Sequence, residues 1–416
     1  MPKALRGTKD ILPSEISLWQ YMESSARYIF SIYGYKEIRT PIIEEANLFI
    51  RSIGDNTDIV KKEMYVFTDR GKRTIALRPE ATASIVRAYL ENSLGQKESL
   101  TKLFYIGPMF RSERPQKGRQ RQFHQLGVEA IGSDSPFLDV EAIVLAVKLL
   151  EKLGVKGFEV RINSLGCQKD KLGIIKHNRK NIKPLLSSLC SECKDRFDKN
   201  VLRIFDCKNE KCRDVVKGIK SGNCLCKGCE GHFDSVKKSL TRLGIKYVVD
   251  QKIVRGLDYY TKTVFEVTQK DLGAKDAICA GGRYNNLIHE MGGNKIPAVG
   301  FAFGTERLIL ALDKDVLPSG PSLDVFVAAS SEDLREEAFS FLNALRSKGL
   351  SSDTDYEKKS LKAQMRKAEK LQARFVVIFG EEEFRENKVV LRDMEKRAQK
   401  TIALDSVASE IERKHS

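Results

Sequence analysis

Arginines that could hold an anionic ligand gather in residues 103–132, which read LFYIGPMFRSERPQKGRQRQFHQLGVEAIG. Two aromatic and branched runs, 103–110 and 122–131, predict paired strands joined by a charged, Gly- and Pro-marked loop. Arg111 and Glu113 follow the first strand, and the loop adds Arg114, Lys117, Arg119 and Arg121. Guanidinium groups match phosphate oxygens bidentately, so the hairpin predicts a polyphosphate ligand. The alternative is a solvated basic hairpin.

The second predicted strand has two different faces. Side chains alternate along a strand, so Phe123, Gln125, Gly127 and Glu129 share one face. The opposite face carries His124, Leu126, Val128 and Ala130. We expect the first face to bind a ligand and the second to pack against the core.

Two further segments suit a polar aromatic ligand. Glu80 and Thr82 end the short run TIALRPEAT, where a carboxylate and a hydroxyl can take an ammonium group, although they can also cap the following helix. Tyr259 and Tyr260 offer aromatic walls and hydroxyls that can pair with a ring nitrogen. Tandem tyrosines are also common at half-buried strand ends, so alone they decide little.

Eight of the nine cysteines lie between residues 167 and 233. Two C-x-x-C pairs, Cys190 with Cys193 and Cys226 with Cys229, predict four thiolates around one structural Zn²⁺. His232 is an alternative ligand, and further cysteines lie between the pairs: Cys207, Cys212 and Cys224. The competing interpretation is a small reduced domain whose thiols are buried filler.

The composition indicates a polyanionic partner. The chain has 416 residues and a formal net charge of +16, and its pI is about 9.3. Lys and Arg are spread along the sequence, which favours nucleic acid as the partner. The sequence has no apolar leader and no run near the ~18 residues of a membrane span, so we expect a cytoplasmic protein without membrane contact.

The helices and strands that must position these residues can be predicted from the sequence pattern. Residues 10–32 predict an amphipathic helix, and Ser135-Pro136 starts another that runs to Gly154. Residues 298–312 predict a strand, a turn and a helix. After a Pro- and Gly-marked linker at 317–322, strands alternate with helices, which predicts a small α/β unit with a parallel or mixed sheet.

Several of these segments resemble signature motifs of class II aminoacyl-tRNA synthetases. The string FRSERPQKGRQRQFHQLGVE resembles the second motif, while EIRTPIIEEANLF and AVGFAFGTERLILAL resemble the first and third. Two strings resemble motifs particular to the histidyl-tRNA synthetase family: RGLDYYT followed by VFE, from Arg255 to Glu266, and AGGRY, which ends at Tyr284. The chain departs from the family at Ala81, usually Gly, and at Asn285, usually Asp.

The resemblance implies an α+β fold with an antiparallel class II catalytic core at 1–320, a Cys-rich insertion at 167–233 and an α/β anticodon-binding domain at 323–416. It implies a homodimeric ligase that activates L-histidine with ATP and Mg²⁺ and transfers the histidyl group to tRNA(His). Pro41, inside the first motif, predicts an edge strand or a subunit boundary.

The resemblance also implies roles for single residues. Arg255 and Arg111 would stabilise the α-phosphate as catalytic residues, and Arg119 and Arg307 would hold the distal phosphates. The remaining ATP contacts would be Glu113 and Phe123. The histidine contacts would be Glu80, Thr82, Gln125, Glu129, Tyr259 and Tyr260.

Two alternative functions predict different sequence features. A histidine-sensing regulatory paralogue typically loses the RGLDYY string and the C-terminal domain, and this chain keeps both. A tRNA-binding sensor without chemistry would need only the basic charge, and three intact arginines at the ATP motifs, Arg111, Arg255 and Arg307, argue against it.

Overall fold

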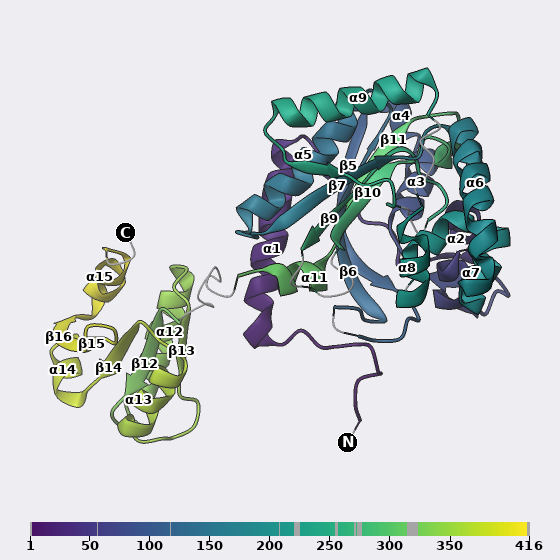
Figure 1. The fold of residues 1–416 in the computed structure, drawn as a ribbon. Helices are drawn as coiled ribbons and strands as arrows, with labels where there is room; N and C mark the ends of the chain where they lie inside the picture. Colours follow the sequence, from purple (N-terminus) through teal and green to yellow (C-terminus); the bar gives the residue numbers. More distant parts are fainter. Residues whose placement is uncertain are drawn as a thin grey trace. The chain divides into compact units, whose positions relative to one another are not determined.

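The chain forms two compact units, Met1–Leu317 and Pro318–Ser416 (Figure 1). The computed structural model describes residues 2–55, 57–116, 118–207, 209–219, 225–253, 257–269, 272, 277–313 and 323–413. The predicted α+β class is confirmed: a mainly antiparallel sheet forms the core of the first unit.

The first unit is built on an eight-stranded sheet in the order β1-β5-β6-β11-β10-β9-β7-β8. Its central strands are antiparallel, and β1 and β8 join the two edges in parallel. The strand bounds are β1 Lys36–Glu37, β5 Thr101–Phe110, β6 Gln122–Ile131, β7 Phe158–Ser164, β8 Tyr247–Val249, β9 Thr261–Gln269, β10 Ala277–Arg283 and β11 Ala298–Gly304. The basic hairpin predicted from the sequence is therefore β5 and β6, which lie between β1 and β11 in this sheet.

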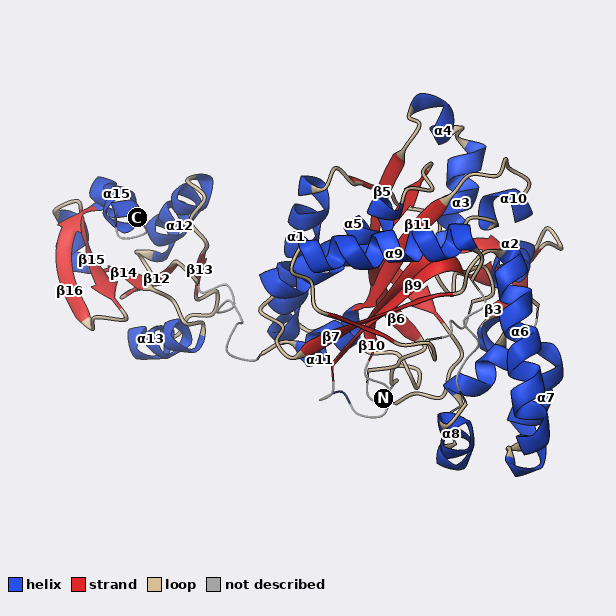
Figure 2. Cartoon of the chain, turned by 45° about the horizontal axis from the view of Figure 1, so that its top comes forward, coloured by secondary structure: helices blue, strands red, loops and turns tan. Residues whose placement is uncertain are grey.

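One face of this sheet is covered by α1 (Pro13–Ile32), α5 (Pro136–Lys152) and α9 (Lys227–Arg242), as Figure 2 shows. Leu126, Val128 and Ala130 of β6 are fully buried in this core. Phe123, Gln125 and Glu129 alternate with them and line a cavity on the opposite face. The predicted alternation of β6 is therefore present in the fold.

A three-stranded sheet, ordered β2-β4-β3, lies beside the cavity elements and consists of β2 (Ile43–Glu45), β3 (Tyr65–Thr68) and β4 (Thr74–Leu77). The expectation of one strand through Pro41 is wrong: Pro41 lies between β1 and β2, and the run continues as helix α2 (Ala46–Ile53). Proline has no N–H for a strand ladder, which explains the break. The remaining short elements of the first unit are η1 (Ile59–Glu63), α3 (Thr82–Glu91), α4 (Leu94–Lys97), α10 (Leu287–Glu290) and α11 (Thr305–Ala311).

The Cys-rich segment forms a helical insertion with α6 (Gln168–Ile182), η2 (Lys183–Ser188), α7 (Ser191–Lys199), η3 (Val201–Asp206) and α8 (Glu210–Lys217). It has a small core of its own that includes Ile174, Ile182, Val201 and Ile204. Cys193, Cys207 and Cys212 are buried in the same core.

The second unit is a five-stranded sheet ordered β13-β12-β14-β15-β16, parallel around β12 and antiparallel from β14 onward. Helices α12 and α15 pack on one face and α13 on the other. The bounds are β12 Val325–Ala329, α12 Arg335–Ser347, β13 Ser352–Thr354, α13 Leu361–Lys370, β14 Phe375–Phe379, α14 Glu381–Arg385, β15 Lys388–Asp393, β16 Ala398–Ala403, η6 Leu404–Ser406 and α15 Val407–Arg413. Across the described ranges of both units, no helix is long and apolar enough to cross a membrane.

A buried ion pair joins the start of α5 to β10. Arg283 and Asp139 are both fully buried, and Arg283 Nη2 lies 2.6 Å from Asp139 Oδ2. The remaining Arg283 N–H groups donate to the Ser133 and Ser135 carbonyls at 2.8 and 2.7 Å. Burial alone would raise the pKa of Asp139, but His232 and Arg283 lower it. Arg283 thus fixes the loop before α5 against the sheet.

Asp139→Ala leaves the Arg283 guanidinium buried without its carboxylate, and we expect it to lower the free energy of unfolding by about 3–5 kcal/mol. Urea unfolding followed by the fluorescence of Trp19, the chain's single tryptophan, reports on this unit's core. The matched double variant Asp139→Leu with Arg283→Met removes both charges and should lose less. A loss below about 1 kcal/mol in the single variant would contradict the role given to this pair.

Candidate active site

A cavity of about 630 Å³ opens on the sheet face opposite α1, α5 and α9. The structure brings most residues predicted from the sequence around this one space. Its lining includes Glu80, Thr82, Arg111, Glu113, Arg119, Phe123, Gln125, Glu129, Tyr259, Tyr260 and Arg307. Arg255, Gly256 and Lys117 lie outside the described residues, so their roles stay predictions from the sequence.

Small residues make the floor of the cavity. Gly127 of β6 pairs with Ala302 of β11, which pairs with Ala280 of β10. Two residues further along these strands, Gly300 of β11 pairs with Glu129 of β6. A Cβ on Gly127 would lie 2.7 Å from the Tyr105 hydroxyl, and one on Gly300 would fall on the Glu129 carboxylate. The glycines at these positions therefore leave room for the Tyr105 and Glu129 side chains on the cavity face of the sheet.

Glu129 is the most deeply buried acid of the cavity, with 1 % of its surface exposed. Its Oε1 accepts a hydrogen bond from Thr82 Oγ1 at 2.7 Å, and its Oε2 accepts one from the Tyr284 hydroxyl at 2.5 Å. Burial raises the pKa of Glu129 to about 8, because no cation among the described residues pairs with it and Glu80 adds repulsion. The site thus contains a buried carboxyl group with a raised pKa that can accept a hydrogen bond from a polar ligand.

Glu80 occupies the turn between β4 and α3. Its carboxylate accepts from the Thr82 and Ala83 backbone N–H groups at 2.7 and 2.9 Å. Burial raises the pKa of Glu80, and these two hydrogen bonds partly offset the effect. Glu80 therefore does act as an N-terminal helix cap, which the sequence also allowed, and it lines the cavity as well.

Tyrosines surround Glu129. The Tyr259 and Tyr260 rings lie 4.7 Å apart, and Tyr259 meets the Tyr284 ring edge-on at 5.7 Å. Burial raises the pKa of Tyr105, Tyr259 and Tyr284 well above the ordinary value, so their hydroxyls stay protonated. The compartment is aromatic in its walls and polar at its end, which suits a polar aromatic guest.

Gln125 supplies an unsatisfied acceptor. Its Oε1 is buried and has no hydrogen-bond partner among the residues that the structure describes. A buried carbonyl oxygen without a partner is costly, so a ligand donor at this point would be favoured. This observation fits the expectation from the sequence that Gln125 contacts a ligand.

Three arginines line the other part of the cavity. The Arg111 guanidinium lies 5.2 Å from the Phe123 ring centre, and its Nε donates to the Pro79 carbonyl at 2.9 Å. Arg119 Nη1 donates to Glu113 Oε2 at 2.9 Å, and Arg307 Nη1 donates to the Ala277 carbonyl at 2.8 Å. The three arginine side chains are held by a carbonyl, a carboxylate or an aromatic ring of the protein. They therefore form a preorganised cationic surface for an anionic ligand.

Sequence reasoning missed part of the lining. Tyr284 ends the AGGRY string, but the string alone gave it no role, and Tyr105 lies on β5 with its hydroxyl inside the site. The insertion also reaches the cavity: Arg203 and Arg196 donate to Asp58 Oδ2 at 2.6 and 3.2 Å. Burial would raise the pKa of Asp58, but these two arginines lower it. No local pattern signals this contact, because it joins residues about 140 positions apart.

The four cysteines predicted to share one Zn²⁺ do not come together. Cys190 and Cys193 lie with Cys207 and Cys212, whereas Cys226 and Cys229 lie with Cys167 and Asp170. The grouping is corrected to two clusters: η3 and α8 lie between the two C-x-x-C pairs along the chain, and each pair meets different partners in the fold. His232 contacts Asp139 at 3.4 Å and belongs to neither cluster, and Cys224 lies outside the described residues.

The raised pKa of Glu129 predicts a pH-dependent stability difference. The folded protein keeps a proton on Glu129 up to about pH 8, whereas an unfolded Glu loses it near pH ~4.3, so folding loses stability as pH rises between these values. Glu129→Gln mimics the protonated form. We expect its free energy of unfolding, relative to wild type, to gain about 1–4 kcal/mol from pH 5 to pH 8.

Urea unfolding followed at Trp19 measures this difference at both pH values. Glu151→Gln is the matched control, because Glu151 is an exposed acid on α5 of the same unit. An equal difference between Glu129→Gln and wild type at pH 5 and pH 8 would mean that Glu129 titrates normally.

Comparisons with known proteins agree over the whole chain. The family model described as Histidyl-tRNA synthetase matches residues 7–308, and the one described as Anticodon binding domain matches residues 324–414. A histidine–tRNA ligase of Pelotomaculum thermopropionicum is 50% identical over 97% of this chain and 95% of its own length. That of Halothermothrix orenii is 49% identical over 99% of both chains.

A solved structure points the same way. The apo histidyl-tRNA synthetase of S. aureus superposes with a TM-score of 0.83 at 34% identity, covering 99% of this chain and 100% of that one. The predicted class II architecture is thereby confirmed. The chain belongs to the histidyl-tRNA synthetase family.

Proposed function

We propose that the chain activates L-histidine with ATP to histidyl-adenylate and transfers the histidyl group to the 3′ end of tRNA(His). The observation that carries this proposal is the composition of one cavity. A surface with three arginines, for a nucleotide, adjoins an aromatic compartment that ends in Glu129. The relatives' names specify histidine and tRNA as well.

In the nucleotide part, Phe123 and Arg111 suit adenine stacking and the α-phosphate, and Arg119 and Arg307 suit the distal phosphates. Glu113 and Glu266 line the same cavity, and carboxylate oxygens are ligands that Mg²⁺ prefers, so these residues would hold it. Mg²⁺ bound there would neutralise phosphate charge. Arg255, which lies outside the described residues, is the second cation proposed for the α-phosphate.

In the histidine part, Glu129 would accept an N–H of the imidazole ring. Tyr259, Tyr260 and Tyr284 enclose that position, and their rings exclude water. Gln125, Glu80 and Thr82 would take the α-ammonium group, for which the unpartnered Gln125 Oε1 is the main support. An apolar ring such as phenylalanine would leave Glu129 without that hydrogen bond.

The chemistry would need no protein nucleophile. A carboxylate oxygen of histidine attacks the α-phosphorus, a C–O–P bond forms, and the bond to the β-phosphate oxygen breaks to release pyrophosphate. A terminal ribose hydroxyl of tRNA then attacks the carbonyl carbon, and AMP leaves. The protein contributes positioning and compensation of charge at the α-phosphate by Arg111 and Arg255.

The net charge of +16 and the anticodon-binding match support tRNA as the partner of the whole chain. Homodimer assembly is part of the proposal. Ile43 and Phe67, which share one face of the small sheet, are 50 and 44 % exposed, as expected of an unpaired apolar interface.

Pyrophosphate exchange measured with each of the twenty amino acids tests the proposed activity. We expect exchange with histidine only, and a fall of at least about a hundredfold in Arg111→Ala and Arg255→Ala because transition-state charge is left uncompensated. Arg242→Ala, an exposed change on α9, is the control. Exchange with another amino acid, or near wild-type rates in both arginine variants, would refute the proposal.

Phe67→Glu places a charge on the proposed interface, and we expect sedimentation measurements to find monomers where the wild-type protein is dimeric. Leu243→Glu tests another exposed apolar side chain, at the end of α9, and should stay dimeric. A monomeric wild-type protein would contradict the assembly.

A further inference from the structure

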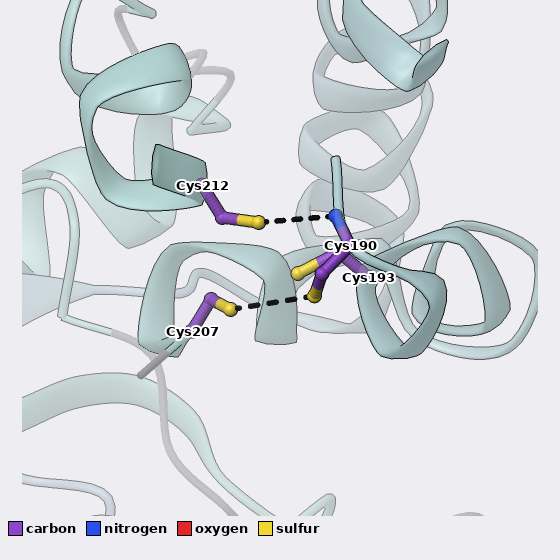
Figure 3. Close-up of side chains that lie close together, drawn as sticks. All are labelled: Cys190, Cys193, Cys207 and Cys212. Carbon is purple, nitrogen blue, oxygen red and sulfur yellow. Dashed lines mark hydrogen bonds between the residues drawn. The ribbon is translucent and has the colours of Figure 1, made fainter. Parts of the chain in front are cut away.

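Four cysteine sulfurs of the insertion point toward one small space (Figure 3). Cys190 precedes α7, Cys193 lies in its first turn, Cys207 follows η3, and Cys212 lies on α8. The four Sγ atoms all lie within 4.8 Å of one another, and Cys190 and Cys207 are 3.9 Å apart. Cys193, Cys207 and Cys212 are buried and Cys190 is half-buried.

We propose that Cys190, Cys193, Cys207 and Cys212 bind one structural Zn²⁺. A tetrahedral site with a zinc–sulfur distance of about 2.3 Å places its sulfurs about 3.8 Å apart, close to the 3.9 Å between the Cys190 and Cys207 sulfurs. The backbone N–H groups of Cys190 and Asn209 donate to the sulfurs of Cys212 and Cys207 at 3.2 and 3.4 Å. Such outer hydrogen bonds orient thiolate ligands and stabilise their charge.

The site would act on the cavity through the segment 194–206, which lies between two of its ligands. Arg196 and Arg203 of this segment both donate to Asp58 at the cavity, and Asn200 Nδ2 donates to Asp258 Oδ1 at 2.8 Å. These contacts link the segment to the body of the unit, and the insertion's own apolar core is small. A metal that closes this loop would therefore hold the arginines in place, as a positioning element without a chemical step.

A disulfide or a set of packed thiols would differ from a zinc site in measurable ways. A disulfide between Cys190 and Cys207 would need their sulfurs at about 2.05 Å, and four packed thiols would bind no metal. The second group, Cys167, Asp170, Cys226 and Cys229, carries no proposal. The Asp170 oxygens already accept from the Cys167 and Cys226 N–H groups at 3.2 and 3.1 Å, and Cys226 is exposed.

The first test is a difference in zinc content between full-length proteins purified without chelator. Elemental analysis should find one zinc equivalent per chain fewer in Cys212→Ser than in wild type, whatever the second group holds. Cys279→Ser, a buried cysteine outside both clusters, should keep the wild-type zinc content. Equal zinc in wild type and Cys212→Ser, or a disulfide in the wild-type intact mass without reductant, would overturn the site.

The second test needs no substitution, so it stands even where Cys212→Ser fails to fold. Wild-type protein is stripped of metal with a chelator and compared with the same protein after zinc is returned. Amide hydrogen exchange in 194–206 should be about tenfold faster in the stripped protein and should slow again with zinc, while α5 is unchanged. Equal exchange in 194–206 in both forms would overturn the positioning role.

Discussion

The structure depends on the cost of burying the Glu129 carboxyl group. A carboxylate taken out of water is expensive, and within the part of the chain that the structure describes Glu129 has hydroxyl partners, Thr82 and Tyr284, in place of a cation. The fold meets this cost with the β6–β11 ladder, which fixes Glu129 opposite Gly300, and with α3, which presents Thr82. A buried carboxyl group kept at such a cost is expected in a selective binding site. A ligand that hydrogen-bonds to this group gains binding free energy that an apolar ligand cannot gain.

The same constraint explains the shape of the sheet. Large side chains point toward α1, α5 and α9, where they form the main apolar core, and small ones form the cavity floor. Gly127 and Gly300 are required because a Cβ at either would occupy space used by Tyr105 or Glu129. The alternation of side chains along each strand thus gives the sheet one face that packs and one face that binds. The packed, rigid face supports the arginines that would contact the nucleotide.

Much of this was predictable from local pattern. The alternation in β6 separated ligand-facing from core-facing side chains, and Ser135-Pro136 indicated the start of α5. Tyr105 and the Arg196–Asp58–Arg203 contact could not be found this way, because they depend on which distant strands and helices meet.

The cysteines illustrate the same limit of local pattern. Spacing identified the two C-x-x-C pairs, but their partners depend on how the helices of the insertion fold together: Cys207 and Cys212 for one pair, Cys167 and Asp170 for the other. Arg255 stays a prediction of the sequence, because it lies outside the described residues.

Selective binding by the Glu129 compartment is tested most directly by calorimetry of the full-length wild-type protein with L-histidine and with L-phenylalanine. We expect histidine to bind at least about a hundredfold more tightly, because only its ring can satisfy the buried carboxyl group, and Glu129→Leu, which removes the hydrogen-bonding group, to abolish most of this preference. Equal affinity of the wild-type protein for the two amino acids, or an unchanged preference in Glu129→Leu, would contradict the role assigned to Glu129.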